Sequence, residues 1–283
     1  MILFTFAGMK HLIKYSFGLM LMAGILASCS PELKKYNQYS RKGTLSEKDS
    51  AAFYFFEQGD CDKASYLLEE LQGAYRGQPR AKDVLFTYCQ AKYDCGFYII
   101  SAYYYEQFAK LYPNEPRTPE ATFMVGYCYF LESAPYYRDQ EFTNKAISQF
   151  QLFINSYPYH QRVEEATNLI IQMRERLAEK DFETATLYFT LENFKAAVTS
   201  FEVFISEFPD SRYREEAEYM RFASAYYLAN ISIASKKKNR FLDAIDYFEA
   251  FADKYPNSVF LKDGEKLYAK AKETLGKIRA EQS

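Results

Sequence analysis

A nine-residue pattern that recurs along the chain constrains the fold more than any other feature. It reads aromatic, two variable residues, Phe, three variable residues, aromatic, Pro, without gaps. Its copies occupy residues 105–113, 150–158, 201–209 and 248–256. The first, fourth and eighth positions share one face of a helix, and the closing proline cannot continue that helix. Each copy therefore predicts the second helix of a helical hairpin that ends sharply.

Small residues and turn formers complete the hairpin. Ala146, Ala197 and Ala244 lie four residues before the first aromatic of three copies, where a small side chain lets a neighbouring helix approach closely. A weaker copy without a closing proline opens the series; it consists of Ala64, Leu68, Leu71 and Tyr75. Helix, turn and helix at these offsets form the tetratricopeptide pattern. The sequence thus predicts an all-α, tetratricopeptide-like α-solenoid of about five repeats with a C-terminal capping helix.

The repeats are longer than usual. Consecutive closing prolines are 45, 51 and 47 residues apart, whereas the usual repeat has about 34 residues. We place the extra length in long helices and in insertions at residues 133–140 and 231–240. The predicted repeats span residues 46–77, 79–114, 118–160, 162–210 and 213–257, and the capping helix spans 262–282 in a domain of residues 46–283. Stacked repeats of this kind present a concave groove to partners.

The first 28 residues predict a lipoprotein signal peptide. A short basic region with Lys10 and Lys14 precedes an uncharged apolar run that is too short for a transmembrane helix, and Met9 is a tidier initiator than Met1. The run ends in Leu-Ala-Ser-Cys, which matches the bacterial lipobox. We expect Cys29 to be acylated and to anchor the mature chain through a tether that ends at residue 45, because several acyl chains bind a membrane stably. A plain signal peptide with an incidental cysteine is the alternative.

Four further cysteines follow the signal. Cys61 and Cys95 fall in neighbouring helix-turn positions and could form a disulfide in an oxidising compartment, whereas Cys89 and Cys128 fall on helical faces expected to be buried. Four buried thiols are the alternative. No CxxC pair and no nearby histidine accompany them, so we expect neither a metal nor a cofactor.

Nothing in the sequence marks a catalytic site. The mature chain has one histidine, His160, in a predicted turn, and it lacks a phosphate-binding loop, a nucleophile elbow and a zinc-binding helix motif. Acidic pairs such as Glu164 and Glu165 lie in first turns of predicted helices, where the helix dipole favours them. We therefore expect a protein that is not an enzyme.

Charge and aromatic content point to protein partners. The net charge of −2 gives no reason to expect nucleic acid. The dense basic run of Lys236, Lys237, Lys238 and Arg240 is either a solvated loop or a surface that contacts an acidic partner. The chain has 27 Tyr and 25 Phe, most of which the repeat pattern assigns to the core. Tyrosine is common at protein interfaces, so we expect part of the surplus to line a groove or partner surface: Tyr98, Tyr103, Tyr104, Tyr136 and Tyr137.

Two segments resemble the BamD (YfiO) family of outer-membrane assembly lipoproteins. Arg138, Asp139 and Gln140, followed by Thr143 and Ala146, are similar to the RDQ-T segment of that family. Residues 173–185, which read MRERLAEKDFETA, resemble its LRxxLAxxE segment. The chain departs from the family at three positions, and the last of them weakens the transfer of partner contacts in the fourth repeat: Asp181, Phe189 and Ser200.

The resemblance implies a function. It suggests a lipid-anchored scaffold of the outer-membrane β-barrel assembly complex that binds the POTRA domains of a BamA-like protein, with the N-terminal repeats holding nascent outer-membrane proteins. Together with the basic run, Arg138, Asp139 and Gln140 are then candidate partner contacts. No Asp follows Cys29, which by resemblance to other bacterial lipoproteins favours the outer membrane, and we expect the periplasmic face. A glycan-capturing lipoprotein and a periplasmic adaptor for cell-wall enzymes remain alternatives; exposed Trp would favour the first, and the chain has none.

Overall fold

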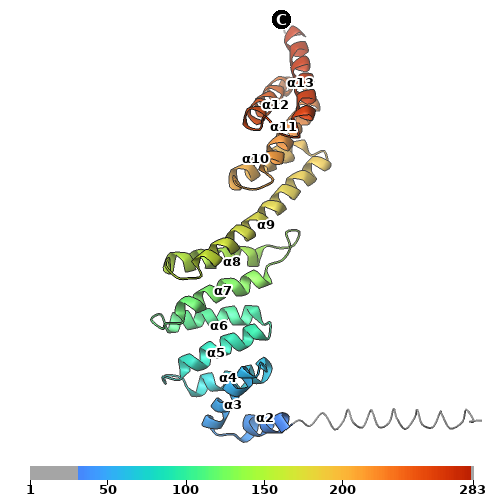
Figure 1. Cartoon of the computed structure of the whole chain (residues 1–283). Coiled ribbons are helices and arrows are strands. Elements are labelled where there is room, and N and C mark those ends of the chain that lie inside the picture. The colour runs from blue at the N-terminus through green and yellow to red at the C-terminus, as the bar shows by residue number, and fades with distance from the viewer. Residues whose placement is uncertain (1–30, 282–283) are drawn as a thin grey trace, which may run out of the picture. The chain divides into compact units, whose positions relative to one another are not determined.

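The computed structural model describes residues 31–281, which form twelve helices and, within that range, no strand. The predicted all-α fold of the tetratricopeptide-like α-solenoid class is confirmed (Figure 1). The helices are α2 (Pro31–Lys42), α3 (Leu45–Glu57), α4 (Cys61–Ala74), α5 (Ala81–Asp94), α6 (Tyr98–Leu111), α7 (Thr118–Glu132), α8 (Glu141–Ser156), α9 (Val163–Thr190), α10 (Phe194–Glu207), α11 (Arg214–Asn230), α12 (Ala234–Lys254) and α13 (Leu261–Glu281). No helix in the described range is long and apolar enough to cross a bilayer.

The chain divides into two compact units between residues 131 and 132. The first unit contains α2 to α6 and nearly all of α7, and the second contains α8 to α13. The third predicted repeat is therefore split, because its first helix belongs to one unit and its second helix to the other.

Two apolar cores hold the first unit together. One lies between α3, α4 and α5 and includes the fully buried Leu68 and Val84. The other lies between α5, α6 and α7 and includes Cys89, Phe108 and Cys128. Figure 1 shows these helices stacked one on the next, from α3 in blue to α7 in green. Each hairpin thus buries its apolar face against the next, as the repeat pattern requires.

The recurring aromatic–proline ending closes each second helix in the same way. The residue before the proline is the C-cap, with φ between −135° and −123° and ψ between 59° and 64°. Its N–H donates to the carbonyl of the Phe four residues earlier, and its ring lies 5.3 to 5.8 Å from that buried Phe. The C-caps are Tyr112, Tyr157, Phe208 and Tyr255. The pattern therefore encodes both a core residue and a helix end.

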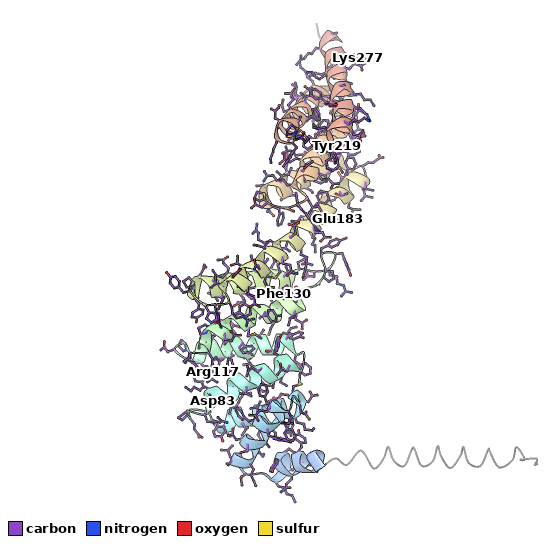
Figure 2. The ribbon with its side chains drawn as sticks, viewed as in Figure 1. Asp83, Arg117, Phe130, Glu183, Tyr219 and Lys277 are labelled. Atoms are coloured by element: carbon purple, nitrogen blue, oxygen red, sulfur yellow. A yellow bond between two sulfur atoms is a disulfide. The ribbon has the colours of Figure 1, made fainter. Side chains whose placement is uncertain are left out.

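Arginines at the starts of successive repeats tie the first unit together. Arg80 precedes α5, and its Nη2 lies 3.2 Å from Asp49 Oδ2 of α3. Arg117 precedes α7, and its Nη2 lies 2.9 Å from Asp83 Oδ1 of α5 (Figure 2). The Arg117 guanidinium also lies 5.0 Å from the centre of the Phe86 ring. Arginine suits both contacts, because its planar group pairs with carboxylates and stacks on rings.

Long helices build the second unit. α9 is a single helix of 28 residues that packs against α8 and α10. Its buried residues include Met173 in its first half and Phe182 in its second half. One core lies between α9, α10 and α11, and another between α11, α12 and α13, around residues such as Phe204 and Phe251.

Two segments, the expected tether and the expected insertion at 231–240, are largely helical. Residues 31–42, expected to be part of a tether, form α2, whose Tyr36 ring packs against Phe55 and Tyr66. The expected insertion at 231–240 is mostly helical, because α12 begins at Ala234 and only residues 231–233 connect it to α11. Neither lysine nor asparagine prevents helix formation, so the polar residues 236–240 form the first turns of α12.

Candidate protein-interaction surfaces

The Arg138, Asp139 and Gln140 segment builds the connection between α7 and α8. Gln140 is buried, and its Nε2 donates to the carbonyl of Pro135 at 2.8 Å and to that of Arg138 at 3.2 Å. Its Oε1 accepts a hydrogen bond from the buried Thr143 hydroxyl at 2.7 Å. Asp139 Oδ1 accepts the N–H of Glu141, the first residue of α8, at 2.8 Å. Gln140 therefore stabilises the loop, whereas Arg138 and Asp139 are exposed and accessible to a partner.

Helix α9 holds this loop from the other side. Arg176 Nη1 donates to Ser133 Oγ at 2.6 Å, and Lys180 Nζ donates to the Arg138 carbonyl at 2.7 Å. Arg176 and Lys180 lie one helical turn apart on α9, so they reach the loop together. The LRxxLAxxE-like segment thus positions the RDQ-like segment, which explains why the two occur in one chain.

An acidic cavity of about 480 Å³ adjoins this loop. Four of its lining residues carry carboxyl groups, and Lys180 carries the one positive charge among the lining residues. Burial raises the pKa of Asp181, and the nearby Glu207 raises it further, whereas Lys180 opposes the shift. The lining carboxyl groups belong to Asp139, Glu141, Asp181 and Glu207. A cavity of this charge suits a basic side chain of a partner.

A second surface lies where the helices of each hairpin connect in the second unit. We call it the turn-edge patch; it comprises Leu187, Leu191, Tyr227, Ile231 and Ile233. Leu191, Ile231 and Ile233 are each between 66% and 69% exposed. Turns are ordinarily polar, so aliphatic residues at two successive turns indicate a surface that a partner covers.

An aromatic cluster supports the turn-edge patch. The Tyr227 ring stacks on Phe194 with centroids 5.2 Å apart and lies 5.9 Å from Phe189. Phe189 is near the end of α9, Phe194 starts α10, and Tyr227 lies one helical turn before Ile231 on α11. The rings therefore join the two turns into one continuous surface.

The turn in the fourth repeat holds its backbone in an unusual conformation. Glu192 has φ of 57°, where the corresponding turns of the first two repeats use Gly59 and Gly96 with φ of 74° and 77°. In this conformation a residue other than glycine is less stable by about 1 kcal/mol, because its Cβ crowds the backbone.

The sequence analysis did not predict the turn-edge patch. Aliphatic residues on both sides of these turns were the signal that could have revealed it.

The predicted basic run adjoins this patch at the start of α12. Lys236 and Lys237 lie in the first turn of the helix, and their N–H groups donate to the Ile233 carbonyl. Arg240 donates to the hydroxyl of Ser232, so it braces the turn. Positive charges at a helix N-terminus oppose the helix dipole by about 0.3–1 kcal/mol each. The first turns of α9 and α11 carry acidic residues instead, so the cationic start of α12 favours an acidic partner.

The cysteines separate into a bonded pair and a buried pair. Cys61 and Cys95 form a disulfide that joins the start of α4 to the end of α5. Asp62 lies beside them, but disulfide sulfurs have no thiolate to offer a metal ion. Cys89 and Cys128 are buried and form no disulfide, and burial raises the pKa of Cys89. Cys29 lies outside the described residues.

The structure also shows the surroundings of His160 and of the surplus tyrosines. His160 Nδ1 accepts the N–H of Arg162 at 3.3 Å, and its ring packs on Phe153, so it shapes a turn. Among the surplus tyrosines, Tyr103 and Tyr137 are exposed. The half-buried ones are Tyr98, Tyr104 and Tyr136.

Comparisons with known proteins identify one family. The family model described as YfiO, outer membrane lipoprotein, matches residues 49–202 and 189–281. The complex of the TPR2AB domain of yeast Sti1 with pHSP90 has 14% identity and a TM-score of 0.39, covering 81% of this chain and 98% of that chain. The assembly chaperone of RpL4, Acl4, has 12% identity and a TM-score of 0.27, covering 84% and 99%. Neither structural likeness is close enough to bear on function, and no curated protein matches the chain.

Proposed function

This chain belongs to the YfiO family of outer membrane lipoproteins, and we propose that it is a lipid-anchored scaffold of the outer-membrane β-barrel assembly complex. In this proposal the second unit binds the POTRA domains of a BamA-like protein. The observation that carries the proposal is the turn-edge patch with its adjoining basic run. Protein interfaces commonly combine exposed aliphatic and aromatic side chains with charged groups that complement the partner.

Membrane attachment follows from the lipobox. Acylated Cys29 would lie two residues before α2 and hold the chain at the outer membrane, facing the periplasm. Two or more acyl chains anchor a protein stably without a membrane-spanning helix.

Nascent outer-membrane proteins are proposed clients of the first unit. A cavity of about 320 Å³ there is lined by Tyr39, Tyr54 and Phe55, together with Ser46 and Glu47. Aromatic walls with a few polar groups suit an apolar side chain of an extended segment. In both roles the chain acts by binding other proteins. The one histidine of the mature chain, His160, accepts a hydrogen bond within a turn.

A pull-down tests the proposal. The full chain with a C-terminal affinity tag, extracted from a Gram-negative envelope in mild detergent, should recover a BamA-like barrel protein. An Ile231→Asp, Ile233→Asp variant should lose it, because two charges would replace aliphatic contacts. Val259→Asp changes a residue of the same unit that is 84% exposed but outside the patch, and it should retain the barrel protein.

The same experiment can contradict the proposal. Recovery of no barrel protein by the parent chain would overturn it. Recovery of peptidoglycan synthases instead would support the adaptor for cell-wall enzymes.

A further inference from the structure

The first unit carries an apolar surface that its own fold does not cover. We call it the outer patch; it comprises Tyr66 of α4 and Phe97, Ile99, Ile100 and Tyr103 at the start of α6. Each of these side chains is between 42% and 58% exposed. Large apolar residues exposed in a group mark a site that contacts another protein or a membrane.

The disulfide brings the two parts of the outer patch together. Cys61 is the first residue of α4, and Cys95 lies two residues before Phe97. Their Cα atoms are 5.5 Å apart. The bond therefore holds the start of α4, which carries Tyr66 in its second turn, against the end of α5 and the start of α6 that follows it.

The repeat pattern shows that this surface is special to the first two repeats. Tyr66 and Tyr103 each lie two residues after a buried small residue, Ala64 and Ser101. Polar residues hold the same position in the three later repeats: Ser148, Thr199 and Asp246. At this position the second helix is thus aromatic only in the two repeats that follow α2.

Helix α2 connects the outer patch to the lipidated end of the chain. The Tyr36 ring of α2 lies 6.2 Å from the Tyr66 ring and 5.6 Å from that of Phe55. Cys29 precedes Pro31, the first residue of α2, by two residues. In sequence Cys29 precedes Tyr36, the residue of α2 that contacts Tyr66 of the outer patch, by seven positions. Acyl groups on Cys29 would therefore be attached next to the helix that makes this contact.

We propose that the outer patch inserts into the headgroup region of the lipid bilayer beside the acylated Cys29. The inference rests on the proposed acylation, which fixes where the membrane begins. Tyrosine favours this position because its ring is apolar and its hydroxyl can stay in water, while the isoleucines reach the acyl boundary. The lipid anchor and the outer patch together orient the first unit on the membrane.

The charges around the outer patch specify the kind of membrane contact. Asp62, Glu69 and Glu70 are exposed on α4, and Lys63 is engaged with Asp60 beside the Tyr36 and Phe55 rings. These acids would repel anionic headgroups, whereas Lys92, whose Nζ lies 5.4 Å from the centre of the Phe97 ring, would attract them. Charges of both signs therefore border the patch. The contact is therefore apolar, suits a zwitterionic surface, and should persist at high salt.

The absence of tryptophan from the chain allows a direct test. Ile100→Trp places a single reporter in the outer patch, where the parent side chain is 42% exposed. Leu152→Trp places one on α8 of the second unit, at a site that is 51% exposed. Each full chain is purified as the mature lipoprotein and reconstituted into phosphatidylethanolamine–phosphatidylcholine vesicles with and without brominated acyl chains. Insertion to about 5–10 Å should quench the Ile100→Trp emission about twofold and leave Leu152→Trp unquenched.

A second arm separates this inference from acylation. The mature chain without acyl groups is coupled through Cys29 to a maleimide phospholipid, because the described cysteines are bonded in the disulfide or buried. Quenching of the Ile100→Trp emission in this arm supports the inference, whether or not Cys29 is acylated in cells. If mass spectrometry finds Cys29 unmodified in cells, that finding counts only against acylation. Emission of Ile100→Trp that brominated lipid leaves unchanged in this arm would overturn the inference. Equal quenching of both reporters would overturn it too.

Discussion

Glu218 Oε1 accepts a hydrogen bond from Lys254 Nζ at 2.6 Å and thereby joins α11 to the end of α12. The same oxygen accepts from Arg214 Nε at 3.0 Å and from the Tyr255 hydroxyl at 3.3 Å. Glu218 is only 6% exposed, so its charge depends on these donors. Tyr255 is also the C-cap of α12, and the carboxylate therefore fixes the point where the fifth repeat ends.

Replacing this carboxylate by an amide should destabilise the second unit. In Glu218→Gln, Lys254 and Arg214 keep their charges but lose a charged acceptor, which costs about 1–3 kcal/mol of unfolding free energy. Urea unfolding followed by circular dichroism measures the loss. Glu273→Gln removes an exposed ion pair within α13 and should leave the stability nearly unchanged, because solvent screens such pairs. Equal losses in the two variants would contradict this role of Glu218.

The same residue predicts a pH dependence. Burial raises the pKa of Glu218, but hydrogen bonds from Lys254 and Arg214 outweigh it and hold the pKa below the ordinary value of 4.5. The unfolded chain therefore binds the proton more readily than the folded chain. The stabilisation is complete above pH 4.5 and is lost as the pH falls through the lowered pKa of the folded state. Unfolding free energies measured between pH 7 and pH 3 should converge for the parent chain and Glu218→Gln at the acidic end. A difference that stays constant would exclude the linkage.

The Cys61–Cys95 disulfide should stabilise the first unit. It closes a loop with a sequence separation of 34 residues, for which chain entropy gives about 3–4 kcal/mol. Replacing both cysteines by serine should lower the urea midpoint of the oxidised protein by a corresponding amount. Adding a reductant should lower the midpoint of the parent chain and leave that of the double variant unchanged. If the reductant left the parent midpoint unchanged, the bond would carry no stability.

Two glycines of α13 offer a matched pair. A Cβ at Gly264 would lie 2.5 Å from Phe248 Cε2, whereas a Cβ at Gly276 would meet nothing within 4 Å. Gly276→Ala should stabilise the protein by about 1 kcal/mol through helix propensity. Gly264→Ala should destabilise it by about 1–3 kcal/mol, because the Phe248 ring has to move within the core. Thermal unfolding of both variants checks the opposite signs, and a gain in both would show that α13 does not pack on Phe248 as described.

The regular part of the fold could be predicted from the sequence because the repeat carries its own geometry. Phe108, Phe153, Phe204 and Phe251 recur at one position of the pattern, and all four are buried. Apolar residues that recur at helical spacing and are followed by a proline predict a helix with a fixed end, and a series of such helices predicts hairpins. The start of α12 was harder to predict, because Lys236 to Arg240 are compatible with both a loop and a helix, and only packing against α11 decides between them.

The interaction surfaces were only partly predictable, because exposure depends on the three-dimensional neighbours of a residue. Gln140 looked like a partner contact in the sequence, yet it is buried and bonds the loop around it. Leu191 and Ile231 received no role in the sequence analysis, yet they are exposed at the turns of two successive repeats that Tyr227 connects. Neighbouring repeats form such surfaces together, and the periodicity within one repeat does not predict which side chains of two repeats come into contact.

Site-specific photocrosslinking in living cells tests most directly whether this lipoprotein holds a barrel-assembly protein through its second unit. A benzophenone amino acid replaces Ile231 in the turn-edge patch in one strain and Val259, which lies outside the patch, in another. Irradiation should join the Ile231 variant to a BamA-like barrel protein through its POTRA domains and should give no such adduct with the Val259 variant. If the Ile231 variant is folded and membrane-bound but forms no adduct with a barrel protein, the result would contradict the account.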